Sequence, residues 1–541
     1  MNLQKIITFF NFSKIQKKVF VYALFIVLHL CLFNVNVAEW GDSYKILKSA
    51  EYIRRLTYPE NEKRPPLMAA VVALRPQKVE AVFWGRVVVF VFSILAFSVF
   101  DKVVSIYIKD EKYRLISLIL FALNPVYLYW SLRIMTDIPF SFFVLFTFYL
   151  LVKWKDSLTV WKSILLGLLC GFAILTRFEG YLMLSSLLVG VTFLGKEFSR
   201  QILKPKALFD NILRQLKFLL PLGLTTLVTI LGWWLYRSPL DSKYLSEPAT
   251  NVYDLKMVWI YFVSFFYLFG FTQFFYIFIK NPAPAVKYFK QNFGLTVFIV
   301  LELILILVWP AALPRLFVSI IPFLILAFVL CYEDFEKSRL ACASREKIKS
   351  IDVLILIFLT FFYAFSQYFL KLQFLISSKT IFVCVLFLQI IILLSLIKGK
   401  GKVFLLLSFT SIFLWSLSVI YLDKDIYVTI VNAAKYAAKN LSGRIIYNDV
   451  SSVSDWYLNQ SGISENASGY YYRVLVKGDL NFKNILKKQA DYLLLTNEQN
   501  PDMEYDLEKR PYLTLVKNFE YNVKGKTFFA KIIKFNGDYI K

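Results

Sequence analysis

The sequence predicts an α-helical polytopic membrane protein that carries an external C-terminal α/β domain. Hydrophobic residues make up 58% of the 541 residues, which is well above their share in a soluble domain. Apolar runs long enough to cross the hydrocarbon core of a bilayer recur between Phe20 and Leu422. The chain after Leu422 instead alternates helix-like and strand-like patterns. We therefore expect a membrane domain over residues 1–422 and an external domain over residues 423–541.

The apolar runs predict about thirteen membrane-spanning helices, because one span needs about 20 apolar residues. The first run follows a basic N-terminus, but it is long and no small-residue cleavage site follows it, so we expect it to be retained as a span. The runs have their cores at Phe20–Val37, Val87–Ile108, Leu115–Ser131, Ile138–Val152, Ser163–Leu175, Tyr181–Leu194, Phe218–Tyr236, Met257–Ile279, Phe293–Leu313, Leu316–Cys331, Val353–Leu370, Ile381–Ile397 and Val403–Tyr421.

The basic residues are spread over the turns between these runs and are not gathered in one domain. The formal net charge of +25 therefore indicates membrane topology and not nucleic-acid binding. With the N-terminus in the cytoplasm, the turns around Lys109, Lys153 and Lys196 become cytoplasmic, as the positive-inside rule requires. An odd number of spans then places the C-terminal domain outside. We expect an integral protein of the plasma (inner) membrane.

Cysteine and histidine usage gives no sign of a disulfide framework or a metal centre. The five cysteines lie in or beside the apolar runs, and the single histidine, His29, lies inside the first run, where we expect a structural role. The sequence has no P-loop, no Gly-rich dinucleotide fingerprint and no paired-aspartate motif that holds a nucleotide sugar through a metal. We therefore expect no cofactor and no metal, and a lipid-linked substrate rather than a nucleotide-linked one.

Two segments outside the spans are long enough to carry specific chemistry, namely the first external loop, about residues 38–85, and the C-terminal tail. The loop has a helix-like stretch with Ile46, Ala50 and Ile53 on one face, as in helices that lie along a membrane surface. A turn with two prolines and a second apolar piece, Leu67–Leu74, follow. The tail predicts helices at Ile430–Lys439 and Asn481–Lys488 and strands at Arg444–Tyr447, Tyr492–Leu495 and Phe528–Phe535.

Asp42 follows the first span directly, in the string Glu39-Trp40-Gly41-Asp42-Ser43-Tyr44, and is therefore expected at the outer membrane surface. A carboxylate in this place can act as the general base for an acceptor hydroxyl group. It can equally cap a helix that begins near Ser43, which is a common use of aspartate. The sequence leaves both roles open.

Lys63 and Arg64 stand before the Pro-Pro turn at the same membrane face. Two cations there can grip a lipid phosphate. They can also form a solvated turn that binds lipid headgroups, which is frequent in interfacial loops.

Further charges stand at the outer ends of later spans. Arg133 and Asp137 have helical i, i+4 spacing and can pair with each other. Arg177 and Glu179 lie between two apolar runs that leave almost no loop, and Arg315 lies in a similarly short turn. A charge at membrane depth costs about 2.5–3.5 kcal/mol or more, so such residues usually face a cavity or a partner.

In this topology most of these charges fall on the outer side of the membrane, and one anion-binding cavity would explain them together. Glu302, near the middle of its span, does not fit this set and is left without a role. The residues that the cavity would collect are Asp42, Arg64, Arg86, Asp137, Arg177 and Arg315.

Four strings in the first half of the chain carry a family resemblance. They resemble the motifs of the polytopic GT-C glycosyltransferases, the group that contains protein O-mannosyltransferases, aminoarabinose transferases of lipid A and galacturonosyltransferases of lipopolysaccharide. Arginine stands here where the family has the lysine of a Lys-Pro-Pro-Leu motif, and Ser43 stands where many relatives have glutamate. The strings are Gly41-Asp42-Ser43-Tyr44, Arg64-Pro65-Pro66-Leu67, Thr136-Asp137-Ile138-Pro139 and Thr176-Arg177-Phe178-Glu179-Gly180.

The resemblance implies roles for the residues in these strings. Asp42 matches the position of the family's proposed catalytic aspartate, and Asp137 matches its second acidic position. Cations beside them are then expected to hold the donor phosphate, with three further residues in support. The expected phosphate-binding residues are Lys63, Arg64, Arg86, Arg177 and Arg315, and the supporting residues are Glu39, Tyr44 and Glu179.

The resulting hypothesis is an inverting glycosyltransferase that moves a hexosyl or pentosyl unit from a polyprenyl-phosphate donor to a lipid, glycan or protein acceptor outside the membrane. Its expected partners are this donor, the acceptor and membrane lipids, with no nucleic acid. A transporter or flippase of lipid-linked sugars is the main alternative, because buried arginines would also serve a moving pyrophosphate. An envelope scaffold protein is another. Asp42 and the external tail favour the enzyme.

Overall fold

The structure is a computed structural model, and the chain divides into two compact units. The helical unit comprises Met1–Leu32, Lys63–Met68 and Val87–Ile420, and the α/β unit comprises Phe33–Glu62, Ala69–Arg86 and Tyr421–Lys541. The residues that the structure describes are 13–59, 62, 64–196, 204–237, 272–309, 314–341, 353–354, 357–358, 379–449, 452–458, 467–469, 491–498, 513–523 and 526–536.

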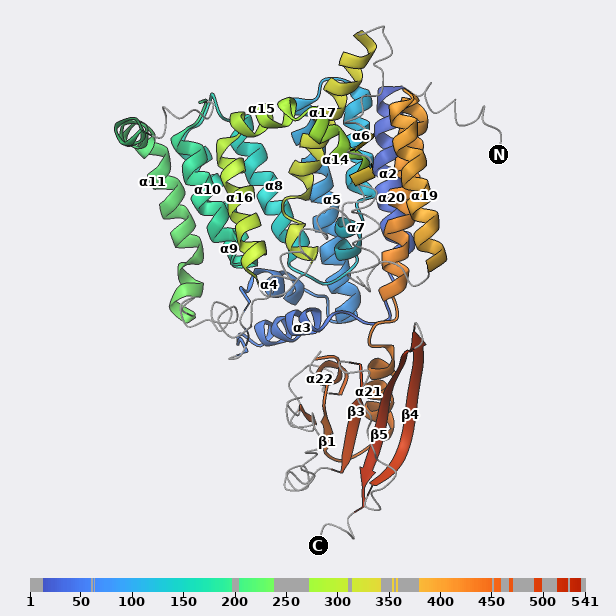
Figure 1. The fold of residues 1–541 in the computed structure, drawn as a ribbon. Coiled ribbons are helices and arrows are strands. Elements are labelled where there is room, and N and C mark those ends of the chain that lie inside the picture. The colour runs from blue at the N-terminus through green and yellow to red at the C-terminus, as the bar shows by residue number, and fades with distance from the viewer. Residues whose placement is uncertain are drawn as a thin grey trace. The chain divides into compact units, whose positions relative to one another are not determined.

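The helical unit is built from apolar helices that run alongside one another (Figure 1). Its helices are α2 (Lys14–Leu32), most of α5 (Ala81–Tyr107), α6 (Glu111–Ala122), α7 (Pro125–Ser131), α8 (Asp137–Lys153), α9 (Val160–Thr176), α10 (Gly180–Thr192), α11 (Pro205–Tyr236), α14 (Thr272–Lys280), α15 (Ala283–Gln291), α16 (Phe293–Val308), α17 (Ile321–Ala341), α19 (Lys379–Ile397) and most of α20 (Gly401–Asp423), with the short 3-10 helix η4 at Pro314–Phe317.

Helix length and composition bear out a membrane protein but leave the number of spans open. Among the described residues, four helices are long and apolar enough to cross a membrane, or up to six if each of two bent pairs counts as one span. α9 and α10 are apolar but shorter. The expected spans Met257–Ile279 and Val353–Leu370 lie largely outside the described residues. The total of about thirteen spans therefore stays a prediction.

Two bends interrupt the bundle at asparagine residues. Asn124 caps α7, because its side-chain oxygen accepts a hydrogen bond from the backbone N–H of Tyr127 at 2.8 Å. Pro125 suits the first position of that helix because it has no N–H to leave unpaired. The axes of α6 and α7 differ by 53°, and those of α15 and α16, which meet at Asn292, differ by 105°.

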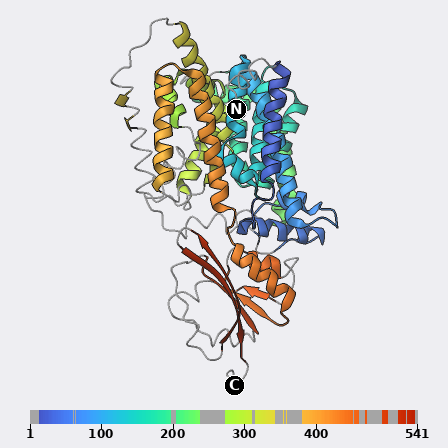
Figure 2. The same ribbon diagram turned by 90° about the vertical axis from the view of Figure 1, so that its right-hand side faces the viewer.

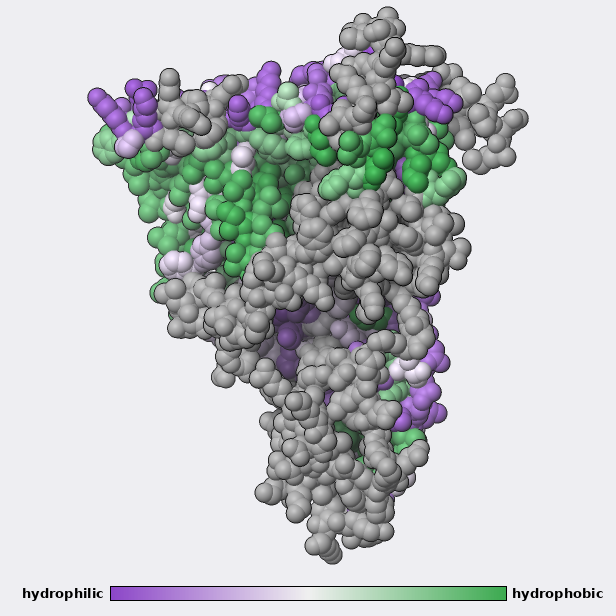
Figure 3. Space-filling view, in the orientation of Figure 1, coloured by the Kyte–Doolittle hydropathy of each residue, from purple (hydrophilic) through white to green (hydrophobic). Residues whose placement is uncertain are grey.

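The surface of the helical unit is apolar along the helices and polar at one end. Figure 3 shows a hydrophobic band over the helices with hydrophilic residues along its upper edge. The turns that follow α5, α8, α10 and α19 lie at this end (Figure 1) and carry the exposed Lys109, Lys155, Lys196 and Lys398. A basic end of this kind is what the positive-inside rule expects of a cytoplasmic face. The orientation in the membrane stays a prediction drawn from these lysines.

The α/β unit contains a mixed sheet and takes in most of the first external loop. In the five-stranded order β2-β1-β3-β5-β4, β1 runs parallel to β2 and β3, and β5 runs antiparallel to β3 and β4. Figure 2 shows α21 against one face of this sheet. The elements are α3 (Gly41–Arg54), most of α4 (Leu67–Ala73), α21 (Val428–Asn440), β1 (Ile445–Tyr447), α22 (Val453–Leu458), β2 (Ala467–Gly469), β3 (Tyr492–Thr496), β4 (Leu513–Val523) and β5 (Lys526–Phe535).

Small and apolar side chains hold α21 on the sheet. Ala433, Ala434 and Ala437 pack in one cluster with Leu494 of β3 and Ile532 of β5, and all five are buried. Alanine on the inner side of a helix lets its backbone come close to the strands, while the strand residues supply the apolar area whose burial stabilises the contact.

The tail elements predicted from the sequence are confirmed where the structure describes them. α21, β1, β3 and β5 coincide with the predicted helix and three strands, and the predicted helix Asn481–Lys488 lies outside the described residues. In the first loop, α3 buries Ile46 and Ala50 as expected. Lys48 of α3 forms an ion pair with Asp455 of α22 at 2.8 Å, so the loop that carries Asp42 packs with the tail inside one unit.

Candidate active site

The helical unit holds a buried group of opposite charges at the turn between α9 and α10. Arg177 forms ion pairs with Asp137, in the first turn of α8, and with Glu179 in its own turn. The two acids are 2% and 5% exposed. A buried charge without a partner is costly, so the forked guanidinium group of Arg177 is what makes the burial of both carboxylates tolerable.

A glycine makes this turn short enough to hold its charges inside. α9 ends at Thr176 and α10 begins at Gly180, which leaves only Arg177–Glu179 between them. A Cβ atom on Gly180 would overlap the backbone of Ile174 in α9, so any larger residue would force the two helices apart. The turn therefore holds Arg177 and Glu179 against the bundle.

Glu302 of α16 belongs to the same group of charges, although the sequence left it without a role. Its Oε1 atom accepts a hydrogen bond from the hydroxyl group of Ser319 at 3.0 Å, and the side chain is 3% exposed. Glu302 also interacts electrostatically with Glu179, Arg177 and Asp137. We call these four residues, Asp137, Arg177, Glu179 and Glu302, the Arg177 cluster.

Two carboxylate oxygens of the Arg177 cluster are poorly satisfied. Among the described residues, no hydrogen-bond donor reaches the buried Oδ2 atom of Asp137 or the buried Oε2 atom of Glu302. A buried acceptor that receives no hydrogen bond costs roughly 1–3 kcal/mol, and more when it is charged. A ligand with hydroxyl or other donor groups would remove that cost.

Two more arginines lie against aromatic rings in the helical unit. Arg315 interacts electrostatically with Glu179, and its guanidinium carbon lies 5.8 Å from the ring centroid of Trp130. Arg133 is fully buried, with its guanidinium carbon 5.1 Å from the ring centroid of Tyr129. Asp137 forms its ion pair with Arg177, whereas the i, i+4 spacing in the sequence had suggested a pair with Arg133.

The cations of the first loop are described in part. Arg64 lies half-buried in the helical unit, directly before Pro65, Pro66 and the start of α4. Lys63 lies outside the described residues. The turn and the apolar piece that the sequence predicted here are therefore present, and Arg64 stands at the N-terminal side of a short helix.

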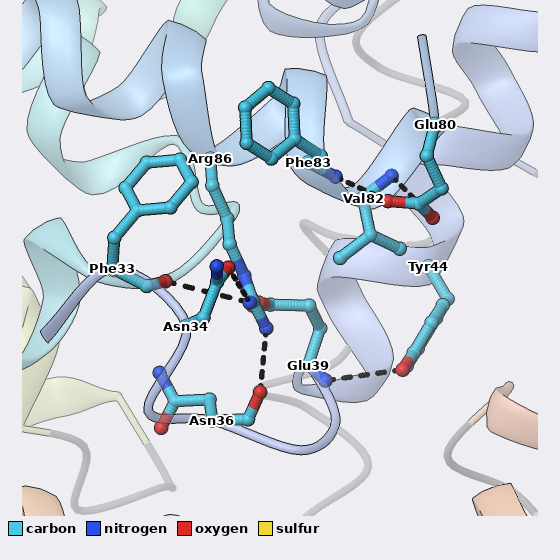
Figure 4. A network of polar contacts seen from close by, with 9 residues as sticks. All are labelled: Phe33, Asn34, Asn36, Glu39, Tyr44, Glu80, Val82, Phe83 and Arg86. Carbon is cyan, nitrogen blue, oxygen red and sulfur yellow. Dashed lines mark hydrogen bonds and ion pairs between the residues drawn. The ribbon is translucent and has the colours of Figure 1, made fainter.

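Arg86 lies in a network of polar contacts within the α/β unit (Figure 4). Its Nε atom donates to Glu39 at 2.7 Å, and one terminal nitrogen donates to the backbone oxygen of Asn36 at 2.9 Å. The other terminal nitrogen lies 3.3 Å from the side-chain oxygen of Asn34 and 3.5 Å from the backbone oxygen of Phe33. This arrangement ties the start of α5 to the segment that precedes Asp42.

Tyr44 extends the network of Figure 4 from the first turn of α3. The backbone N–H of Glu39 donates to its hydroxyl oxygen at 3.1 Å. Burial, reinforced by the neighbouring Tyr457, raises the pKa of Tyr44 well above its usual value. Tyr44 therefore stays protonated. Its hydrogen bond with Glu39 holds the segment between the first span and α3 in place.

Asp42 is not the residue that caps α3. The helix begins at Gly41, and its N-cap residue is Trp40, which makes no side-chain capping bond. Asp42 stands in the first turn and is half-buried. A carboxylate in a first turn interacts favourably with the helix dipole, but the N-cap explanation that the sequence offered does not describe this helix.

The described residues offer no obvious metal centre. Among them, no group of three or more histidine, cysteine, aspartate or glutamate side chains is arranged to hold a metal ion. His29 instead donates from Nδ1 to the backbone oxygen of Phe25 at 2.8 Å, with Nε2 at 2.8 Å from the hydroxyl group of Ser131. The expectation of a metal-free site stays a prediction.

Part of the chain matches a known family. Residues 63–223 match the profile of a family described as dolichyl-phosphate-mannose-protein mannosyltransferase. The matched segment contains Arg64 and three members of the Arg177 cluster. A comparison with curated proteins finds no match.

Solved structures share the fold over nearly the whole chain. ArnT from Cupriavidus metallidurans, bound to undecaprenyl phosphate, gives a TM-score of 0.60 at 13% identity, over 95% of this chain and 97% of that chain. The archaeal oligosaccharyltransferase AglB from Archaeoglobus fulgidus, in complex with an inhibitory peptide and a dolichol-phosphate, gives 0.53 at 10% identity, over 97% of this chain and 75% of that chain.

The arabinofuranosyltransferase AftD from mycobacteria gives a TM-score of 0.51 at 11% identity, over 97% of this chain and 40% of that chain. The chain therefore shares its fold with these three structures. Together with the family match over residues 63–223, this confirms the resemblance that its motifs suggested.

Proposed function

We propose that this protein is a membrane glycosyltransferase that takes a sugar from a polyprenyl-phosphate carrier and adds it to an acceptor at the outer face of the membrane. The observation that carries the proposal is the buried Arg177 cluster, three of whose members lie in the segment that matches the mannosyltransferase profile. ArnT is bound to undecaprenyl phosphate and AglB to a dolichol-phosphate. Both ligands are lipid phosphates of the class that we propose as the carrier.

Charge burial supports a functional rather than a structural reading of the cluster. Ionisable residues at membrane depth are expensive and usually mark a substrate path or a binding site. The unsatisfied oxygens of Asp137 and Glu302 are suitable acceptors for sugar hydroxyl groups, because each hydroxyl supplies one donor. An apolar ligand would leave both oxygens unpaired.

In the proposed reaction, the acceptor hydroxyl oxygen attacks the anomeric carbon of the donor sugar. The new carbon–oxygen bond forms as the bond from that carbon to the phosphate oxygen breaks, and the bonding electrons leave with the lipid phosphate. Asp42 takes the proton of the acceptor hydroxyl as general base. Attack opposite the leaving group inverts the anomeric configuration in one step.

Cations stabilise the charge that develops on the departing phosphate. We assign direct contact with the phosphate to Arg64 and Arg315, together with Lys63, because cationic side chains form strong hydrogen bonds to phosphate oxygens. Arg177, whose terminal nitrogens pair with Asp137 and Glu179, is assigned a contribution through its charge. The scheme uses no metal, because these cations already neutralise the phosphate. Arg86 is assigned differently, since its guanidinium group is committed to Glu39 and the segment before α3. We propose that Arg86, Glu39 and Tyr44 hold Asp42 in place.

Sugar transfer from a defined donor tests the proposal. The protein is placed in lipid nanodiscs and given a small panel of polyprenyl-phosphate sugars, and release of the sugar is compared between native protein, Asp42→Asn and Arg64→Ala. We expect Asp42→Asn to abolish turnover while donor binding is retained, and Arg64→Ala to weaken donor binding. Asp156→Asn and Arg55→Ala are matched controls, because both side chains are exposed, and both should behave as native protein.

The same experiment separates the enzyme from its alternatives. Movement of the donor across the bilayer with an intact sugar–phosphate bond, and no effect of Asp42→Asn, would assign the chain to transport. Absence of donor binding by native protein would leave the charges with a structural role, as in a scaffold protein.

A further inference from the structure

A cavity lies in the helical unit, at the opposite end of α8 from the Arg177 cluster. It has a volume of about 300 Å³ and lies between the end of α8, the end of α10 and the bend that joins α15 to α16. α8 has 17 residues from Asp137 to Lys153, so its two ends are about 25 Å apart. The cavity is therefore separate from the site described above.

Close helix packing and a fixed bend build this cavity. α10 and α16 cross at Gly190 and Gly294, where a Cβ atom on Gly294 would lie 2.6 Å from the Cα atom of Gly190. At the bend, the hydroxyl group of Tyr107 donates to the side-chain oxygen of Asn292 at 2.5 Å. Small residues at a helix crossing and a hydrogen bond between helices are the usual means of close packing in a membrane. The walls are thus fixed by a close backbone contact and by a hydrogen bond between side chains.

The lining of the cavity is apolar on one side and basic on the other. Phe148, Leu151 and Val152 of α8 supply part of the apolar wall, and Lys155 and Lys196 are the two charged residues. Of the described residues that line the cavity, none is acidic. The cavity therefore combines a surface for hydrocarbon with two cations.

The two lysines differ in how they are held. Lys196 donates to the side-chain oxygen of Asn211 in α11, which fixes its ammonium group near the cavity. Lys155 is exposed, and it forms no ion pair within the described part of the chain. Its charge is available to a ligand.

We propose that this cavity binds one anionic phospholipid from the leaflet at the basic end of the helical unit. Its phosphate would contact Lys155 and Lys196, and an acyl chain would lie along Phe148 and Val152. Basic pockets between membrane helices select anionic headgroups over neutral ones. A free phosphate ion would use the lysines but would leave the apolar wall exposed. The proposal does not depend on the reaction proposed for the Arg177 cluster.

Lipid retention tests the proposal directly. The full chain is placed in nanodiscs made from equal parts of phosphatidylcholine and phosphatidylglycerol, transferred to mild detergent, and its bound lipids are counted by native mass spectrometry. We expect native protein to retain phosphatidylglycerol in preference to phosphatidylcholine. We expect Lys155→Glu to lower this retention at least about fivefold, since one basic residue near the membrane surface contributes about that factor.

Two further variants separate loss of binding from loss of structure. Lys287→Glu makes the same charge change on an exposed lysine of α15 that does not line the cavity, and should retain the lipid. Val152→Trp fills the space beside the apolar wall without changing the charge, and this variant should no longer retain the lipid. Equal retention of phosphatidylglycerol by native protein and Lys155→Glu, or no preference of native protein for it, would overturn the proposal.

Competition identifies the source of the anion. Neither added inorganic phosphate nor added polyprenyl phosphate should displace phosphatidylglycerol, because the first lacks acyl chains and the second belongs to the proposed donor site. Displacement by inorganic phosphate would make the cavity a free-anion site. Displacement by polyprenyl phosphate at matched concentration would make it a carrier-lipid site. Either result would contradict a phospholipid site.

Discussion

Arg177, at the end of α9, forms an ion pair with Asp137, at the start of α8, although the two residues are 40 positions apart in the chain. The same guanidinium group pairs with Glu179. One side chain thus joins the ends of three helices and neutralises two buried carboxylates. Removing it would leave two negative charges inside the bundle, whereas removing either acid would leave Arg177 with the other.

We predict that Arg177→Gln lowers the free energy of unfolding by about 3–5 kcal/mol, the usual cost of breaking a buried ion pair. Arg177→Lys should cost less, because lysine keeps the charge but cannot reach both acids with a planar fork. Thermal unfolding of the detergent-solubilised protein measures both effects.

Adding Asp137→Asn to Arg177→Gln should recover part of the lost stability, because the acid that has lost its cation is then neutral. Arg214→Gln serves as the control, since Arg214 is exposed on α11, and it should leave the melting temperature unchanged. Equal melting temperatures for Arg177→Gln and Arg214→Gln would show that the pair contributes nothing to stability.

Glu302 is expected to act in substrate binding or turnover rather than in folding. Glu302→Gln keeps an oxygen that can accept the hydrogen bond from Ser319 but replaces the carboxyl group that interacts with Arg177 by an amide. We predict that transfer falls about tenfold, which corresponds to about one charge-assisted hydrogen bond, while the melting temperature does not fall. Sugar transfer at saturating donor, measured beside thermal unfolding, checks this.

Ser319→Ala tests the other side of the contact between Ser319 and Glu302. It removes the donor to Glu302 Oε1 and should cost about 1 kcal/mol of stability, with a smaller effect on transfer than Glu302→Gln. If Glu302→Gln transfers sugar at the native rate, Glu302 has a structural role only.

The fold could be predicted well from the sequence where local pattern decides it. Apolar runs gave the positions of α2, α5, α8 and α20, because burial in lipid requires an uninterrupted apolar stretch. The hydrogen bond that Asn292 receives from Tyr107 at the bend between α15 and α16 could not be predicted, because the two residues are 185 positions apart. Local patterns carry no information about such contacts.

The candidate site, like the fold, could be predicted only in part from the sequence. Asp42, Arg64, Asp137 and Arg177 stand in short strings that the sequence singles out, and a charge between apolar runs is visible without a structure. Glu302 was visible as a charge, but its place in the Arg177 cluster was not.

The partner of Arg86 could not be predicted from the sequence. Arg86 was expected to bind phosphate because it is an arginine at the predicted outer face, and that role stays a prediction; its partner Glu39 is 47 positions away and no spacing rule connects them. Type and depth of a charge can be predicted from sequence, and its partner cannot.

A double-mutant cycle tests the proposed anchoring role of Arg86. Arg86→Met leaves the buried Glu39 without its cation and should destabilise the protein by about 3 kcal/mol or more. Glu39→Gln in the same chain should restore part of that loss, with a coupling energy of roughly 1–3 kcal/mol. Thermal unfolding gives the coupling, and the kinetics of sugar transfer give the effect on catalysis.

The kinetics distinguish an anchor from a phosphate ligand. If Arg86 positions Asp42, then kcat should fall and the KM for the donor should change little. A large rise in the donor KM with native stability would instead restore Arg86 to the phosphate site. Arg55→Met, on an exposed side chain of the same loop, is the control for loss of a positive charge.

Glu498, two residues after the end of β3, gives the α/β unit a stability that depends on pH. Burial raises the pKa of its carboxyl group from 4.5 to about 7, opposed by a hydrogen bond from the hydroxyl group of Thr429 at 2.5 Å. The folded state therefore holds the proton more tightly than the unfolded state does. The contribution of Glu498 is favourable below pH 4.5 and is lost as the pH rises to about 7.

Glu498→Gln removes this dependence, because the amide stays neutral at every pH. We predict that it stabilises the α/β unit by roughly 1–3 kcal/mol at pH 8 and by almost nothing at pH 4. Hydrogen exchange of the backbone amides of Leu493, Leu494 and Leu495, corrected for the intrinsic pH dependence of exchange, reports the opening free energy of β3. Glu520→Gln, on the exposed side of β4, should change protection at neither pH. Protection that is the same in native protein and Glu498→Gln at pH 8 would mean that Glu498 is ionised in the folded state at no cost, and that its burial does not disfavour the charge.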